Sequence, residues 1–226
     1  MASHLVVRAC PPFRVPGQHT APPAAELERD ALRFLDPPEL ERARAMMPVP
    51  RQDFLAARVA QRRFAAELLG VRAQDLTSRY SCPRCGSGPG VTHGRPGYEL
   101  DGAPAPLLLS LSRAAGWTLL AAVAEPGPGQ RLGVDAEDPR RLDFDGFDAV
   151  ALTPAEYRAL APLQGSALLR ERARLWARKE AFLKMTGEGL GRPPETLDVL
   201  DRADVRDLAS AESGLPDGLA AAVALG

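Results

Sequence analysis

Hydrophobic residues recur at helical spacing between residues 166 and 185. At about 100° per residue, six apolar side chains fall on one arc of this predicted helix: Leu168, Leu169, Leu175, Trp176, Phe182 and Leu183. Lys179 lies inside that arc, Glu180 lies at its margin, and Lys184 lies just outside it. A buried charge is costly without a partner, so the pattern indicates a charged ligand or a metal beside the helix. The alternative is an ordinary amphipathic helix whose lysines extend into solvent.

Helical spacing also predicts two helices in the N-terminal half. Asp36 precedes two prolines and a glutamate, which is a typical helix start, so residues 40–47 are expected to be helical and to stop at Pro48. A longer amphipathic helix is expected over residues 51–70, ending at Gly70. Its four arginines are interpreted as a solvated face: Arg51, Arg58, Arg62 and Arg63.

From Pro106 onward the pattern changes to strands. Residues 107–112, 117–124 and 132–137 are expected to form an antiparallel meander separated by glycine-containing turns. In the third strand, Asp135 and Glu137 lie on one face because side chains alternate along a strand. Two carboxylates this close repel each other unless a cation lies between them. A solvated outer face is the alternative explanation.

The remaining elements are predicted from shorter signals. A strand is expected over residues 5–8, followed by a proline-rich connection from Pro11 to Pro23, and residues 142–150 look mobile. Thr153, Pro154 and Glu156 form a capping box that starts a helix. Gly187 is expected to end the helix of residues 166–185. Three closing strands are expected at residues 199–200, 205–208 and 219–225.

Composition excludes several classes of protein. The 226 residues carry 28 Lys and Arg against 29 Asp and Glu, a net charge of −1, which argues against a protein devoted to nucleic acid or anionic membranes. No apolar run reaches the roughly 20 residues that span a bilayer, and the N-terminus lacks a signal-peptide pattern. Three cysteines do not form a disulfide framework, so a reducing cytoplasm is expected.

Two of the cysteines form a C-x-x-C pattern in a loop expected over residues 81–96. Cys82 and Cys85 flank Pro83 and Arg84, and His93 follows eight residues after Cys85. Two thiolates and an imidazole suit zinc, but a closed structural zinc site has four ligands and three candidates are present locally. Reduced structural cysteines are therefore the favoured interpretation, and zinc is the alternative.

Three acids and two lysines indicate phosphate chemistry. Asp135, Glu137 and Glu180 offer the hard oxygen ligands that Mg²⁺ prefers. Lys179 and Lys184 are the only lysines in a chain that otherwise uses arginine, which suggests a task for a compact ammonium. The residue types alone predict a magnesium-dependent reaction at a phosphate or pyrophosphate.

Two motifs resemble those of a known family. Residues 133–137, Gly-Val-Asp-Ala-Glu, are similar to a G-V-D-x-E motif, and residues 176–189 are similar to W-x-x-K-E-A-x-x-K-x-x-G-x-G. Both motifs belong to the 4′-phosphopantetheinyl transferases of the surfactin-synthetase-activating type. Residues 93–96, His-Gly-Arg-Pro, resemble that family's upstream x-G-[K/R]-P, and residues 110–112 resemble its strand before a Ser-His pair. The resemblance covers about residues 34–225.

The resemblance implies an α+β fold of two similar α/β subdomains related by a pseudo-twofold axis, with coenzyme A between them. The expected division is an N-terminal half of residues 1–106 and a C-terminal half of residues 107–226 that carries the Mg²⁺ site. The implied enzyme is a cytoplasmic monomer. It transfers the phosphopantetheine arm of coenzyme A to a serine of an acyl or peptidyl carrier protein in secondary metabolite biosynthesis, and it releases 3′,5′-ADP.

The resemblance also implies roles for single residues. Asp135, Glu137 and Glu180 would hold Mg²⁺, with Glu180 also acting as the general base. Lys184 would meet the leaving phosphate as a catalytic and coenzyme-binding residue. The other residues expected to bind coenzyme A are Lys179 at the pyrophosphate, Arg95, Ser112 and Arg113, with Arg51 and Arg58 at the 3′-phosphate.

Arg113 stands where the family usually has histidine. An arginine can pair with a phosphate but cannot act as a general acid near neutral pH. The departure therefore affects any acid–base role at this position and leaves the expected metal site unchanged.

Two other classes of function remain open on the sequence. One is a non-catalytic module that binds coenzyme A or a carrier protein. The absence of a metal-binding acid would have favoured this class, but all three acids are present. The other is a nucleic-acid protein built on Cys82, Cys85 and His93. The near-neutral charge and the missing fourth ligand argue against the second class.

Overall fold

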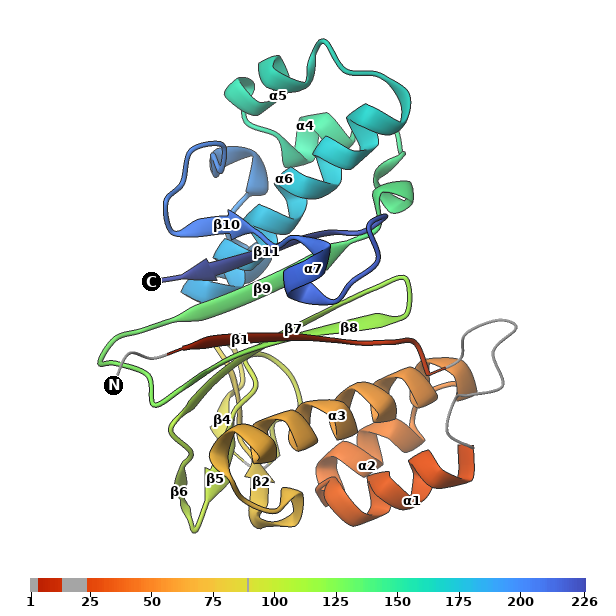
Figure 1. Ribbon diagram of the computed structural model, residues 1–226, viewed down its shortest axis with the longest axis vertical. Helices are drawn as coiled ribbons and strands as arrows, with labels where there is room; N and C mark the ends of the chain where they lie inside the picture. The colour runs from red at the N-terminus through yellow and green to blue at the C-terminus, as the bar shows by residue number, and fades with distance from the viewer. Residues whose placement is uncertain (1–3, 14–23, 89) are drawn as a thin grey trace. The chain divides into compact units, whose positions relative to one another are not determined.

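The computed structural model describes residues 4–13, 24–88 and 90–226 (Figure 1). The chain divides into two compact units. Unit 1 takes in the described parts of residues 1–5, 10–109 and 122–126, and unit 2 takes in residues 6–9, 110–121 and 127–226. The proline-rich connection expected from Pro11 to Pro23 falls largely on residues 14–23, which lie outside the described residues. The division after residue 106 and the pseudo-twofold relation remain predictions.

Three helices form the first part of unit 1: α1 (Ala24–Phe34), α2 (Pro37–Arg44) and α3 (Pro48–Leu69). Helix α1 was not predicted from the sequence. The sequence analysis expected Pro48 to stop a helix, but Pro48 is the first residue of α3, where a proline loses no helical hydrogen bond. Gly70 ends α3 in the left-handed conformation with φ 67°, as predicted. The apolar core of these helices is formed by Leu27, Ala31, Phe34, Leu35, Ala43, Phe54, Leu55 and Val59.

Arg62 of α3 is buried, although it was expected on a solvated face. Its guanidinium donates to Asp36 Oδ2 at 2.7 Å, to Glu39 Oε2 at 2.9 Å and to the Leu76 carbonyl at 2.8 Å. Asp36 also accepts a hydrogen bond from the backbone of Ser78 at 2.6 Å. A buried ion pair with this many partners links the start of α2 to the following strand. The helical pattern could not reveal it, because the partners come from other elements.

The strands of unit 1 are short. A three-stranded antiparallel sheet has the order β2-β5-β6, and a separate hairpin pairs β3 with β4. The hairpin lies where a loop was expected over residues 81–96. The bounds of these elements are Ala73–Asp75 for the 3₁₀ helix η1, then Leu76–Ser78 (β2), Tyr80–Cys82 (β3), Gly86–Gly88 (β4), Tyr98–Leu100 (β5) and Ala103–Pro104 (β6).

Unit 2 contains the antiparallel sheet β10-β11-β9, formed by Val205–Asp207 (β10), Ala220–Leu225 (β11) and Leu132–Glu137 (β9). Strand β9 pairs with β11, with Asp135 opposite Ala222, so its expected place as third strand of a meander is wrong. The other sheet has the order β1-β8-β7, formed by Leu5–Cys10 (β1), Trp117–Ala124 (β8) and Leu107–Ala114 (β7). Ala115 and Gly116 both have positive φ between β7 and β8, as tight hairpin turns require.

The long helix α6 (Gly165–Thr186) packs on β9 and β11 and ends at Gly187 with φ 81° (Figure 1). Helix α5 (Pro154–Leu160) begins with the predicted capping box: Thr153 Oγ1 accepts from the Glu156 backbone at 3.2 Å, and Glu156 Oε2 accepts from the Thr153 backbone at 2.8 Å. The shorter helices are η2 (Pro139–Leu142), α4 (Phe147–Ala151), η3 (Gly189–Gly191), η4 (Pro194–Thr196) and α7 (Ser210–Ser213).

Two expectations for unit 2 are corrected. Residues 142–150, expected to be mobile, end η2 and begin α4, whose Phe147 is buried in the core. Val199 and Leu200 form no strand, although Val199 is fully buried. The described helices include none that is long and apolar enough to cross a membrane.

Candidate active site

Gly133 brings strand β9 into direct contact with helix α6. A Cβ atom at this position would lie 1.9 Å from the Ala181 carbonyl oxygen and 2.5 Å from the Met185 backbone nitrogen. Both atoms belong to the helix backbone and cannot rotate away. The glycine therefore sets how closely β9 approaches α6, and Asp135, two residues further on, lies on the same face of the strand.

Asp135 is the buried centre of the site, with 3% of its surface exposed. Its Oδ1 accepts from the Ser112 hydroxyl at 2.7 Å and from the Lys184 ammonium at 2.6 Å. Its Oδ2 is buried and has no hydrogen-bond partner among the described residues. An unsatisfied buried carboxylate oxygen is costly, so Oδ2 is an open position for a positively charged ligand.

Strand β7 positions this carboxylate from a second direction. Ser110 Oγ accepts from the Val134 backbone N–H at 2.9 Å, and Ser112 donates to Asp135. Both serines are buried, as expected for alternate residues of one strand face. The structure shows the Ser112 hydroxyl donating to Asp135, and the contact of Ser112 with coenzyme A stays a prediction.

Lys184 extends from the last turn of α6 to the same point. Its ammonium contacts Asp135 Oδ1 and also the carbonyl oxygens of Val134 at 3.2 Å and Leu111 at 3.3 Å. The Lys184 side chain keeps 31% of its surface exposed, whereas the Asp135 side chain keeps 4%. The lysine is therefore anchored at the buried acid and still accessible from solvent.

Glu137 and Glu180 extend the negative charge around Asp135. Burial, then the charge of Asp135, raises the pKa of Glu137 to about 8, while Lys184 opposes the rise. Burial and the charge of Asp135 also raise the pKa of Glu180, and Lys184 again opposes it. Two carboxyl groups whose pKa is raised by burial and by a third, buried carboxylate form a site that a cation stabilises.

The residues fit a divalent cation with hard oxygen ligands. The donors are carboxylates without sulfur or imidazole, which matches Mg²⁺, and the unpartnered Asp135 Oδ2 offers one ligand position. Among the described residues, these three acids do not form a group in which one ligand atom of each lies within 4.8 Å of the others. The carboxylates are therefore more widely spaced than a closed set of metal ligands.

Lys179 is not in this cluster, although the sequence analysis placed it at the pyrophosphate. It is fully buried, and its ammonium contacts Glu156 Oε2 at 2.6 Å, the Leu197 carbonyl at 2.7 Å and the Pro194 carbonyl at 2.8 Å. Three acceptors satisfy its three N–H groups. Burial lowers its pKa, and the ion pair with Glu156 opposes this. Lys179 therefore ties α6 to the start of α5 and to both ends of η4.

The sequence analysis missed the role of Glu156 in this pairing. Besides capping α5 and pairing with Lys179, its Oε1 accepts from the Val199 backbone at 3.0 Å. The capping-box pattern predicted only the local contact. Two signals pointed to a buried partner: the place of Lys179 inside the apolar arc, and its retention in a chain that otherwise uses arginine.

The remaining residues expected to bind coenzyme A lie at separate positions. Arg113 is exposed and follows Ser112 on β7, so strand alternation directs it to the opposite face. In unit 1, Arg51 forms a bidentate pair with Glu28. Arg58 donates to the Thr92 carbonyl at 2.9 Å and lies over the Tyr80 ring with its guanidinium carbon 4.2 Å from the centroid. Both arginines are thus held by their own unit.

Arg95 lies beside the β3–β4 hairpin. Its backbone exchanges two hydrogen bonds with Ser81, at 2.8 and 2.9 Å. The segment of residues 93–96, which resembled a coenzyme-binding motif, is thereby paired to the strand that ends at Cys82.

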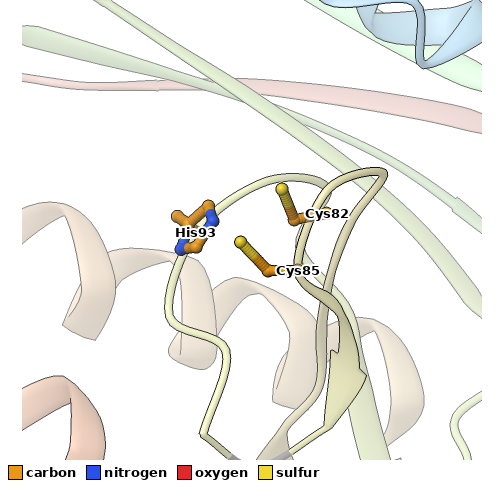
Figure 2. A group of neighbouring side chains, drawn as sticks. All are labelled: Cys82, Cys85 and His93. Carbon is orange, nitrogen blue, oxygen red and sulfur yellow. The ribbon is translucent and has the colours of Figure 1, made fainter.

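Cys82, Cys85 and His93 form a second cluster (Figure 2). One ligand atom of each residue lies within 4.8 Å of the others, whereas the sequence analysis favoured reduced structural cysteines. Hydrogen bonds from the backbone N–H groups of Arg84 and Cys85 lower the pKa of Cys82. The pKa of Cys85 is raised, first by its hydrogen bond with Cys82.

The acids, the lysine and the glycine-mediated contact of β9 with α6 define a charged site in a unit of mixed helix and sheet. Residues 131–217 match the family model of the 4′-phosphopantetheinyl transferase superfamily. The match covers less than half of the chain, and it includes Asp135, Glu137, Glu180 and Lys184. The comparison with curated proteins finds no match.

Proposed function

We propose that this chain transfers the 4′-phosphopantetheine arm of coenzyme A to a serine hydroxyl of an acyl or peptidyl carrier protein. The proposal includes Mg²⁺ as the cofactor, 3′,5′-ADP as the second product, and the surfactin-synthetase-activating type of enzyme. One observation carries it: a buried Asp135, paired with Lys184 through one oxygen and unpartnered at the other, lies in the segment that matches the superfamily model.

Asp135, Glu137 and Glu180 are the residues that would hold the metal. Bound to them, Mg²⁺ supplies positive charge that stabilises the oxygens of the pyrophosphate. Lys184 supplies a second positive charge from the end of α6. Its ammonium is already directed at the acid cluster and partly exposed, so a phosphate arriving from solvent meets it without a change in the helix.

In the proposed reaction the serine oxygen bonds to the phosphorus that carries pantetheine. The bond from that phosphorus to the bridging oxygen of the pyrophosphate breaks, and 3′,5′-ADP leaves. The serine proton passes to the carboxylate of Glu180, which acts as the general base. Lys184 donates to the leaving phosphate as its negative charge develops.

The structural observations that support a role in coenzyme binding differ from residue to residue. Arg95 belongs to a segment fixed to β3, and Arg113 is exposed at the end of β7, so both are suited to a phosphate. Ser112, whose hydroxyl donates to Asp135, is proposed to contact a phosphate of the coenzyme from beside that acid. Arg51 and Arg58 would need to exchange Glu28 and the Thr92 carbonyl for a phosphate.

The test is transfer to a panel of apo carrier proteins with coenzyme A and Mg²⁺, followed by intact mass. We expect a mass gain of one phosphopantetheine that requires both coenzyme A and Mg²⁺. Glu180→Gln should lose at least about a hundredfold in rate. The matched control is Glu171→Gln, a carboxylate on the same helix that pairs with Arg174 at 3.2 Å, and it should keep the rate.

The alternative is a module that binds coenzyme A or a carrier protein without catalysis. Magnesium-dependent thermal protection by coenzyme A, without transfer to any carrier protein, would favour this alternative. The absence of both protection and transfer would contradict the proposed site as a whole.

A further inference from the structure

The β3–β4 hairpin of unit 1 presents two sulfur atoms and an imidazole to one another. Cys82 ends β3, Cys85 lies in the turn, and His93 lies in the segment after β4. Their ligand atoms lie within 4.8 Å of one another, and Figure 2 shows both sulfurs on the side of the hairpin that faces the His93 ring. His93 is eight positions from Cys85 and eleven from Cys82, so chain proximity alone does not bring the imidazole to the two sulfurs.

The turn between the cysteines is held in one shape. Cys82 pairs with Gly86 across the hairpin, and the Cys85 backbone donates to the Cys82 carbonyl at 3.2 Å. Gly86 has φ 78°, which favours glycine at this position. The backbone N–H groups of Arg84 and Cys85 donate to the Cys82 sulfur. Such hydrogen bonds orient a thiolate ligand and stabilise its charge.

The segment around His93 is fixed on both sides. Before it, the Thr92 carbonyl accepts from Arg42 at 2.7 Å and from Arg58 at 2.9 Å. After it, Gly94 has φ 88°, and a Cβ there would lie 2.2 Å from the Ser81 carbonyl oxygen. The next residue exchanges two backbone hydrogen bonds with Ser81. The backbone contacts of the neighbouring residues therefore hold His93 beside the two cysteines, without any contribution from its own side chain.

We propose that Cys82, Cys85 and His93 bind one Zn²⁺ ion, with a water molecule as the fourth ligand. Two thiolates and a neutral imidazole are typical zinc ligands and balance its charge. Binding displaces the two thiol protons to solvent. Within the part of the chain that the structure describes, no fourth Cys, His, Asp or Glu atom joins the group, which leaves the fourth position to solvent.

The ion would fasten the hairpin to the segment that carries Arg95. The two backbone hydrogen bonds between Ser81 and Arg95 are the existing connection, and a metal bridging Cys82 to His93 adds a second one beside it. Whether zinc binds can be tested apart from the proposed transferase activity, because Cys82, Cys85 and His93 are not among the proposed coenzyme-binding residues and the test uses neither coenzyme A nor a carrier protein.

The test measures metal content in the full chain, purified without a histidine tag under reducing conditions. We expect close to one zinc per chain by elemental analysis after dialysis against metal-free buffer. Cys82→Ser/Cys85→Ser should remove it, and His93→Ala should weaken zinc affinity at least tenfold in competition with a chelator. The matched controls are Cys10→Ser and His4→Ala, which alter a cysteine and a histidine outside the cluster and should keep the zinc.

Two further measurements use the unmodified chain, in case the variants fold poorly. Cobalt(II) in place of zinc should give thiolate-to-metal absorption, and removal of zinc by a chelator should speed hydrogen exchange at the amides of Ser81 and Arg95. Three outcomes would each overturn the proposal: no zinc uptake by the reduced chain, zinc retained by the double cysteine variant, or an isolated chain whose Cys82 and Cys85 are joined by a disulfide.

Discussion

Gly133→Ala tests whether the contact between β9 and α6 positions the acid cluster. The added Cβ would lie 1.9 Å from the Ala181 carbonyl oxygen and 2.5 Å from the Met185 nitrogen. Carbon–oxygen contacts settle at about 3.3–3.6 Å, so the strand must move from the helix by roughly 1.5 Å. Because both obstructing atoms are backbone, rotation of a side chain cannot relieve the overlap.

Two consequences follow from this displacement. Overpacking of this kind costs about 1–3 kcal/mol in the free energy of unfolding. The separation also lengthens the contact between Asp135 on β9 and Lys184 on α6, now 2.6 Å. A misplacement of about 1 Å typically costs about a hundredfold in rate, so we expect at least that loss of carrier-protein transfer.

The assay combines single-turnover transfer with thermal and denaturant unfolding. The matched control is Gly127→Ala, which lies in the turn before β9, where a Cβ would meet nothing within 4 Å. We expect Gly127→Ala to keep both rate and stability. Transfer and melting of Gly133→Ala at the level of the unmodified chain would refute the claim that this glycine sets the site.

Three further predictions address the charged residues. Asp135→Ala should lower transfer by at least about a hundredfold, measured at saturating Mg²⁺, with the fold retained in circular dichroism because Lys184 can reach solvent. Lys179→Met should cost about 3–5 kcal/mol in denaturant unfolding because it leaves Glu156 buried and unpaired. Lys184→Met also removes a partner of a buried acid, but its distinguishing effect should be a loss of at least about a hundredfold in the rate of transfer. Since the pKa of Glu137 rises from 4.5 to about 8 on folding, the folded state holds this proton more tightly, and metal-free stability should fall by about 1–2 kcal/mol between pH 5 and pH 8. Glu137→Gln should flatten that pH profile, and an unchanged slope in this variant would contradict the assignment.

Local patterns predicted the elements that carry the candidate site. The apolar arc of residues 166–185 and the glycine after it gave the extent of α6 within one residue at each end. The alternation in residues 132–137 placed Asp135 and Glu137 on one face, and the structure puts Asp135 of that face against Lys184. Both predictions depend on the period of a single element, which the sequence contains directly.

Contacts between distant elements were not predictable in the same way. Strand β9 pairs with β11, about 90 residues later in the chain, and short apolar strands do not specify their partners. Arg62 looked like part of a solvated face because its partners, Asp36 and Glu39, precede it by more than 20 residues. Pro48 was ambiguous because a proline both follows helices and begins them.

The two lysines of α6 both belong to the motif of residues 176–189, but only one of them lies at the candidate site. Lys179 and Lys184 are five positions apart, which separates them by more than one helical turn and turns them to different faces. Lys179 contacts three acceptors and is fully buried, so its charge holds the start of α5 and the helix η4 against α6. Lys184 meets an acid whose second oxygen has no partner among the described residues. A buried charged group whose hydrogen bonds are all made stabilises the fold. A buried charged group with an unpartnered atom marks a position where a bound ligand would be stabilised. By that criterion the candidate site centres on Asp135 and Lys184.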